Sequence, residues 1–222
     1  MNFKYCRFQK EIVLRCVRWY LSYPLSLRHI EEMMTERGIS VDHSTINRWV
    51  NKFSPLLEAE ARKRRKPVGT SWRLDETYIR VKGKWKYLYR AVDKEGSTID
   101  FLLTAKRDER AARRFLVKAI GNSGSQTLIT VDKSGANHAA ITSYNTDTGS
   151  TIEIRQIKYL NNIVEQDHRA VKRIIRPMLG FKSFWYAANT LAGIELIHML
   201  RKGQMAQNSN LALHQQFDLL AA

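Results

Sequence analysis

Hydrophobic residues recur at helical spacing through the first sixty positions of the chain. Between residues 10 and 22 an apolar side chain returns every three or four positions, which predicts a short amphipathic helix. Ser26 can cap a second helix that ends near Gly38, a residue suited to the left-handed conformation after a helix. Ser40 or Asp42 can then begin a third helix. The pattern therefore predicts three consecutive helices.

The third predicted helix has an apolar inner face and a polar outer face. The outer positions carry hydroxyl, amide and cationic groups: Ser44, Thr45, Asn47, Arg48, Asn51 and Lys52. Helix, glycine-containing turn and short polar helix are typical of a helix-turn-helix unit, which reads the major groove of DNA. The amide of Asn47 suits adenine and the guanidinium of Arg48 suits guanine. We predict an all-α helix-turn-helix domain over residues 1–60, with a plain three-helix bundle as the alternative.

A run of cations, ARKRRK at residues 61–66, stands before Pro67 and Gly69. Charge runs of this kind are usually solvated, and in a basic protein they can also lie along phosphates without reading sequence. We therefore predict a basic linker at residues 61–69 between two domains.

After residue 70 the pattern changes to one typical of strands. Residues 71–104 read as three strands joined by short turns, and Asp108 can cap the helix that follows. The apolar run TLITV then ends at Asp132. A loop with a short helix, a fifth strand and further helices follow, which predicts a mixed five-stranded α/β sheet with flanking helices over residues 70–202. We expect the last helix of this stretch to cover a sheet face, and we assign no role to the C-terminal tail, residues 203–222.

The segment from Asn161 to Arg176 separates into two faces when read as a helix. One face is apolar, and the other holds a single acid, Glu165, among His168 and three cations: Arg169, Lys172 and Arg176. Taken alone this is a surface helix with an internal salt bridge, because Glu165 and Arg169 stand four residues apart. An acid among cations can also ligate a metal beside a polyanion.

Two further acids turn the second interpretation into a specific hypothesis. Asp75 lies in the first predicted strand and Asp132 ends the fourth, so both can meet Glu165 near the carboxyl ends of the strands. Three carboxylates that would repel one another when empty form a site for hard divalent cations. Two such ions support in-line phosphoryl transfer.

Other acids and nucleophiles compete with this trio. Strand alternation directs Glu76 to the face opposite Asp75. Asp100 is the most serious competitor, and we interpret it as a packing or supporting acid, while Asp167 belongs to the apolar side of its helix. Nothing orders Ser134 and His138 as a nucleophile and base, which disfavours a hydrolase triad.

Amino-acid composition indicates the class of binding partner and the cellular compartment. The chain of 222 residues has 37 Lys and Arg against 21 Asp and Glu, a net charge of +16 that favours a polyanion as partner. No apolar run reaches the ~18 residues that span a bilayer, and the first residues lack a signal-peptide pattern. Cys6 and Cys16 have neither disulfide-framework nor zinc-ligand spacing. We expect a cytoplasmic, nucleoid-associated protein.

Several long strings resemble the DDE transposases of bacterial insertion sequences, and most closely the insertion sequence 6 family. They are DHSTINRWV, WRLDETYIRVKGKWKYLYRAVDKEG, TVDKSGAN, RQIKYLNNIVEQDHRAVKRII and LGFKSFWYAANTLAGIE. The resemblance implies a ribonuclease H-like catalytic domain, two Mg²⁺ ions that Mn²⁺ can replace, and a dimer or larger homo-oligomer acting on double-stranded DNA. It implies Asp75, Asp132 and Glu165 as the catalytic, metal-binding residues, with Lys172 as a basic DNA contact seven residues after the glutamate.

The sequence therefore predicts a transposase that binds the terminal inverted repeats of its element and catalyses strand cleavage and strand transfer. Its predicted DNA contacts are Ser44, Thr45, Asn47, Arg48, Lys52, Arg169, Lys172 and Arg176. Two alternatives remain. One is an integrase or nuclease on the same fold, and the other is a non-catalytic DNA-binding regulator.

Overall fold

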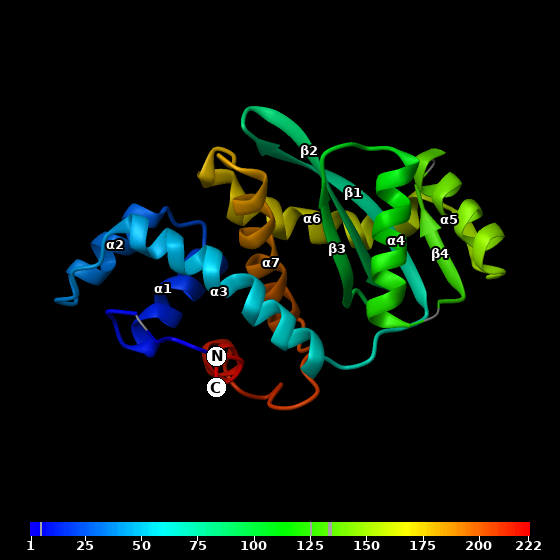
Figure 1. Ribbon diagram of the computed structural model, residues 1–222. Coiled ribbons are helices and arrows are strands. Elements are labelled where there is room, and N and C mark those ends of the chain that lie inside the picture. Colours follow the sequence, from blue (N-terminus) through cyan, green and yellow to red (C-terminus); the bar gives the residue numbers. More distant parts are fainter. Residues whose placement is uncertain (5, 125, 133–134) are drawn as a thin grey trace. The chain divides into compact units, whose positions relative to one another are not determined.

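A computed structural model describes residues 1–4, 6–124, 126–132 and 135–222, with only the backbone of Lys158 (Figure 1). Ser134, considered above, lies outside these ranges. The chain divides into two compact units, Met1–Lys66 with Val171–Ala222, and Pro67–Ala170. Within the described ranges, every helix is too short or too polar to cross a membrane.

The first unit begins with the three predicted helices, α1 (Lys10–Ser22), α2 (Leu27–Thr35) and α3 (His43–Arg64). The Ser26 hydroxyl accepts a hydrogen bond from the backbone N–H of His29 and caps α2. The Asp42 carboxylate accepts one from the N–H of Ser44 at 2.7 Å and caps α3. Ser26 thus caps α2 as expected, and of the two candidates for the start of α3, Ser40 and Asp42, the structure has Asp42.

Helix α3 is longer than expected and extends into the predicted linker. Residues 61–64 are its last turn, with Ala61 fully buried. Arg62 and Arg64 each pair with a glutamate four residues earlier, Glu58 and Glu60. These i,i+4 pairs neutralise part of the charge run, so it continues the helix where the sequence was interpreted as a linker.

Helix α7 (Phe184–Arg201) belongs by packing to the first unit, where its partners are α3, α1 and α8 (Leu213–Leu219). A Cβ added to Gly193 would lie 2.5 Å from a Leu21 methyl carbon and 2.7 Å from the Ser54 hydroxyl. The missing side chain therefore lets α7 approach α1 and α3 closely. The sequence had grouped this helix with residues 70–202 and assigned it to a sheet face. That assignment was wrong because an apolar pattern does not show which element a helix packs against.

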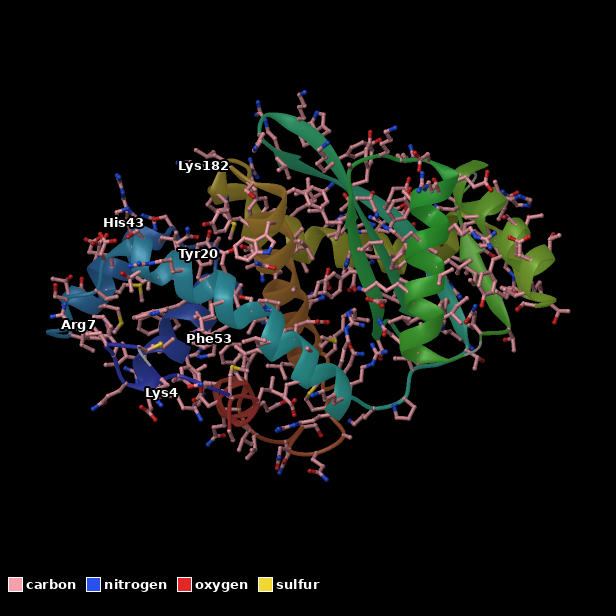
Figure 2. All side chains as sticks on the ribbon, viewed as in Figure 1. Lys4, Arg7, Tyr20, His43, Phe53 and Lys182 are labelled. Carbon is pink, nitrogen blue, oxygen red and sulfur yellow. The ribbon has the colours of Figure 1, made fainter. Side chains whose placement is uncertain are left out.

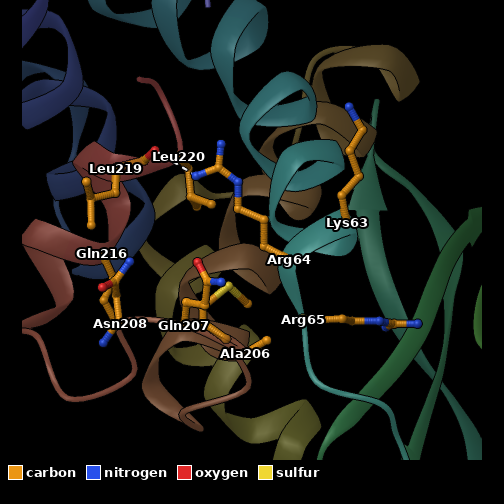
Figure 3. Close-up of a pocket in the computed structure, with 10 residues that line it drawn as sticks. Lys63, Arg64, Arg65, Ala206, Gln207, Asn208, Gln216, Leu219 and Leu220 are labelled. Atoms are coloured by element: carbon orange, nitrogen blue, oxygen red, sulfur yellow. Dashed lines mark hydrogen bonds between the residues drawn. The ribbon is translucent and has the colours of Figure 1, made fainter.

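The C-terminal segment is ordered against the end of α3. Arg65 forms an isolated β-bridge with Met205, and Phe217 and Leu220 are buried. The Arg64 guanidinium donates a hydrogen bond to the Leu219 carbonyl at 3.0 Å, beside a hollow of about 350 Å³ (Figure 3). The C-terminal tail, to which the sequence assigned no role, thus completes the first unit through a few buried apolar side chains.

The second unit is built on a five-stranded sheet ordered β3-β2-β1-β4-β5. The strands are β1 (Ser71–Val81), β2 (Lys84–Asp93), β3 (Thr98–Thr104), β4 (Leu128–Val131) and β5 (Glu153–Gln156). The first three pair antiparallel, while β4 and β5 run parallel to β1. The predicted mixed, ribonuclease H-like sheet is confirmed, and its fifth strand is short, with only the four residues Glu153–Gln156.

Helices α4 (Glu109–Ser123) and α5 (Gly135–Thr148) cover one face of this sheet (Figure 1). They enclose the core of the unit with apolar side chains that include Trp72, Tyr89 and Phe115. The carboxylate of Asp108 caps α4 as expected, accepting from the N–H of Ala111. Helix α5 is longer than the short helix predicted from the sequence. The prediction was too short because the many Ser, Thr and Asn residues of α5 leave little apolar periodicity.

A short 3₁₀ turn, η1 (Lys158–Asn161), leads into α6 (Asn162–Ile175), the helix predicted at residues 161–176. A second 3₁₀ turn, η2 (Arg176–Met178), ends it. The first half of α6 contacts the sheet face opposite α4, where Asp167 pairs with Arg90 of β2 at 3.1 Å. The division between the two units falls within this helix.

Candidate active site

Asp75 and Asp132 are brought together by parallel strand pairing. Leu74 of β1 stands beside Val131 of β4 in the register, so Asp75, within β1, and Asp132, directly after the end of β4, stand next to each other. Both carboxylates are partly exposed. The predicted convergence of these two acids thus follows directly from the register of β1 and β4.

Glu76 joins them, contrary to the expectation from strand alternation. One carboxylate oxygen from each of Asp75, Glu76 and Asp132 lies within 4.8 Å of the other two. Beyond Leu74 the neighbouring strand β4 has ended, so side chains from both faces of β1 can reach the same space. The three residues form what we call the acid cluster.

Asn137 and Arg107 hold Glu76 in place. The Asn137 amide, from α5, donates to Glu76 Oε2 at 2.9 Å, and Arg107 forms an ion pair with Glu76 and lies 3.9 Å from Asp132. Burial raises the pKa of the Glu76 carboxyl, while the Asn137 bond and the Arg107 charge oppose the increase. Burial of the Arg107 guanidinium acts to lower its pKa, but the neighbouring groups, the Glu76 carboxylate foremost, together outweigh this effect, and the pKa of Arg107 is raised. Sequence reasoning had not identified Arg107 or Asn137.

His168 lies against Asp75. Its Nε2 is 3.1 Å from Asp75 Oδ2, and the imidazole is buried. The sequence had placed His168 on the exposed basic face of its helix, because side-chain spacing alone does not show which part of a helix meets the sheet. In the structure it ties α6 to the acid cluster.

Glu165 is exposed in the first turn of α6 and lies outside the group formed by the acid cluster. Its helix is fixed nearby, since His168 bonds to Asp75, Asp167 pairs with the buried Arg90 and Val164 is fully buried. Glu165 is thus carried on an anchored helix, one turn before the histidine that touches Asp75. The structure brings together two of the three predicted acids and leaves the third at the exposed start of α6.

Asp100 has a structural environment of its own. Its side chain is fully buried, with one carboxylate oxygen 2.8 Å from the Lys118 ammonium and the other 2.8 Å from the Asn122 amide, both on α4. These contacts join β3 to the helix that covers it. Asp100 therefore acts as a packing acid, in agreement with the interpretation of the sequence.

The predicted DNA-reading residues lie along α3 in the first unit. Ser44, Arg48 and Lys52 are exposed, Thr45 and Asn47 are half-buried, and the Arg48 guanidinium donates to the Thr45 hydroxyl at 2.8 Å. Asn51, expected on the outer face, is buried and donates to the Asn47 carbonyl. The outer face of α3 therefore keeps the hydroxyl, amide and cationic groups at its first two turns.

A hollow of about 460 Å³ adjoins this face within the first unit. Its lining includes His43, Ser44 and Asn47 from α3 together with Lys182 from the segment before α7 (Figure 2). Lys182, which is not among the predicted contacts, adds a cation to the rim. The three predicted cations of the α6 segment, Arg169, Lys172 and Arg176, are all exposed.

Comparison with known proteins decides the family. Residues 69–204 match a family model described as a DDE domain. Over 208 residues the chain is 40% identical to the transposase for the insertion sequence-like element IS431mec of Staphylococcus aureus, covering 90% of this chain and 88% of that protein. The chain belongs to the DDE transposases of the insertion sequence 6 family. The transposase for insertion sequence element IS257 in transposon Tn4003 of the same organism is 39% identical over 208 residues, with the same coverage.

Solved structures with a similar backbone include two retroviral integrase cores. The catalytic core domain of HTLV-2 integrase in complex with magnesium (trimeric form) has a TM-score of 0.48 at 14% identity, covering 68% of this chain and 97% of that chain. The catalytic core domain of BIV integrase has a TM-score of 0.44 at 16% identity, covering 57% and 82%.

Family membership makes the chain an enzyme of DNA transposition that uses divalent metal ions. The acid cluster of this transposase has the chemistry for them, because three carboxylates within 4.8 Å offer the hard oxygen donors that such ions prefer. With a pair of acids from adjacent strands and Glu76 beside them, the residues present fit a divalent cation.

Proposed function

We propose that this transposase binds the terminal inverted repeats of its element and carries out cleavage and strand transfer with Asp75, Asp132 and Glu165. The observation that carries the proposal is the parallel register that sets Asp75 of β1 beside Asp132, directly after the end of β4. Recognition falls to residues 1–60, with Ser44, Thr45, Asn47, Arg48 and Lys52 facing the DNA. Arg169, Lys172 and Arg176 contact phosphates near the cut.

Mg²⁺, which Mn²⁺ replaces, is the proposed cofactor, held as two ions by Asp75, Asp132 and Glu165. When bound, these ions would activate the attacking oxygen and stabilise the leaving oxygen. The side chains of the protein position the metal ligands and the DNA. Asp75 is held by His168, the cations bind and orient the phosphates, and no side chain forms a covalent bond to DNA.

Two successive in-line displacements at phosphorus complete the proposed reaction. In the first, water attacks at the element end and releases a 3′-hydroxyl. In the second, that hydroxyl attacks a phosphodiester of the target, joins the element end to the target 5′-phosphate and releases a target 3′-hydroxyl. We propose that a dimer or larger homo-oligomer holds the element ends during both steps.

Substitution of single acids tests the catalytic assignment. Asp75→Asn, Asp132→Asn and Glu165→Gln should each abolish Mg²⁺-dependent cleavage and joining of end-sequence oligonucleotides while leaving binding of the ends unchanged. Glu76→Gln serves as the comparison within the acid cluster, because it removes the charge that is not part of the predicted trio. Full activity in all three variants would refute the assignment, and cutting without joining would favour a nuclease.

A further inference from the structure

The β1–β2 hairpin continues beyond the rest of the sheet. Strand β4 pairs with β1 only as far as Leu74, and β3 pairs with β2 only from Tyr87 onward. Among the described strands, the pairs from Ile79 with Lys86 to Val81 with Lys84 therefore have no third strand beside them, and the pair Tyr78 with Tyr87 borders the end of β3 (Figure 1). We call residues 78–87 the outer hairpin.

One face of the outer hairpin carries exposed aromatic rings. Register places Tyr78 opposite Tyr87 and Arg80 opposite Trp85 on the same face, while Ile79 and Val81 point to the other face and are buried. Tyr78 is 47% exposed and Trp85 60%. The ring centroid of Tyr78 lies 6.2 Å from that of Trp85 and 5.4 Å from that of Tyr87. The rings form a short row in which Tyr87 packs partly against the core, while Tyr78 and Trp85 remain accessible.

The outer hairpin carries several cations and, over residues 77–92, no Asp or Glu. Arg80 stands on the face of the rings and Lys82 at the turn, both exposed, while Lys84 and Lys86 pair with Val81 and Ile79 and start from the other face. A tight turn at Lys82 and Gly83, both with positive φ, holds the two strands in register. The surface combines positive charge with accessible aromatic faces.

The aromatic row begins next to the acid cluster. Glu76 precedes Tyr78 by two residues on the same face of β1, a spacing of about 7 Å along a strand. Arg107, which pairs with Glu76 and Asp132, stands at this junction. A DNA strand whose phosphate lies at the acid cluster can thus continue directly onto the outer hairpin within the second unit.

We propose that the outer hairpin is a binding site for single-stranded DNA, in which Tyr78 and Trp85 stack on unpaired bases and Arg80 and Lys82 bind the phosphates. Aromatic rings interleaved with cations are the arrangement by which proteins hold single strands, whereas a duplex hides the faces of its bases. The inference rests on the proposed function only in taking the bound strand to be the one cut at the acid cluster.

Binding of a short fluorescent oligothymidine by the full chain tests the proposal, measured by anisotropy in EDTA beside a duplex of random sequence. Trp85→Ala should weaken oligothymidine binding about tenfold, because one base loses the ring on which it stacks, and should change duplex binding much less. Tyr78→Ala should act in the same direction. Replacing Arg80 and Lys82 by Gln should make the affinity less dependent on salt.

Trp185→Ala is the matched control, because Trp185 is 59% exposed on α7 in the other unit, and it should leave oligothymidine binding unchanged. Circular dichroism and thermal melting establish that each variant is folded, and Trp85→Phe should retain most of the affinity. Unchanged oligothymidine binding in Trp85→Ala, or an equal loss for oligothymidine and duplex, would overturn the proposal. Asp75→Asn should not weaken this metal-free binding, which separates the inference from the catalytic assignment.

Discussion

Glu76 and Asp75 point to opposite faces of β1, and their carboxylates nevertheless share one small space. Alternation along a strand correctly assigns the direction of each Cβ, but a glutamate side chain is long and the neighbouring strand β4 ends at Val131. The exclusion of Glu76 from the site was therefore wrong about position, while its role in the reaction is still to be tested. The sequence contained only a weak indication that Arg107 belongs to the site, namely a cation in the loop directly before the cap of α4.

His168 is the residue whose replacement should report on the position of Asp75. Its Nε2 lies 3.1 Å from the Asp75 carboxylate, so His168→Ala frees that carboxylate to move. Loss of a side chain that orients a metal ligand typically costs 10–100-fold in metal affinity or activity. We expect weaker Mn²⁺ binding in a calorimetric titration and a higher Mn²⁺ requirement for strand cleavage.

Two variants define the specificity of this effect. His138→Ala changes an exposed histidine of α5 and should leave both Mn²⁺ measurements unchanged. His168→Gln keeps a hydrogen-bonding group and should recover part of the loss. An Mn²⁺ affinity in His168→Ala equal to that of the unmodified chain would show that the contact does not position Asp75.

At the scale of elements, helical periodicity predicted that α1, α2, α3, α4, α6 and α7 exist, but it did not predict which elements they pack against. Helix α7 is apolar on nearly every side, so its sequence fits a sheet face as well as a helical bundle. Its close approach to α1 and α3 depends on Gly193, where no side chain separates the backbones. This contact, and not the apolar pattern, assigns α7 to the first unit.

Gly193→Ala should therefore destabilise the first unit. The added Cβ would meet Leu21 and Ser54 at 2.5–2.7 Å, and inserting a methyl group into a packed core typically costs 1–3 kcal/mol. Chemical denaturation followed by circular dichroism measures the change in unfolding free energy.

Gly121→Ala is the opposite case in α4, since no atom lies within 4 Å of the added Cβ. It should stabilise the second unit by about 0.5–1 kcal/mol, because alanine is the better helix former. Equal effects of the two substitutions would contradict the packing described for α7.

At the scale of the whole molecule, the net charge of +16 makes contact with phosphates a general property of the chain. Exposed cations occur on α3, on α6 and on the outer hairpin, so binding to DNA of any sequence should release many counterions.

We expect the affinity for random duplex DNA to fall steeply with salt, by roughly 10³-fold or more between 50 and 200 mM if six to ten phosphates are contacted. Anisotropy titrations over this range measure the slope of log affinity against log salt concentration. An affinity that is nearly independent of salt would show that the excess of Lys and Arg does not engage DNA phosphates.

The sequence by itself determined the class of fold, most helices and strands, the caps at Ser26 and Asp108, and the two acids on neighbouring strands, because these depend on local periodicity and on strand ends. Tertiary structure alone decided that Glu76, Arg107 and Asn137 surround those acids, that His168 is buried against Asp75, and that α7 packs on α3. Periodicity states which face of an element is buried. The partner of that face, and the distance between side chains on different strands, depend on register and packing that no short stretch of sequence contains.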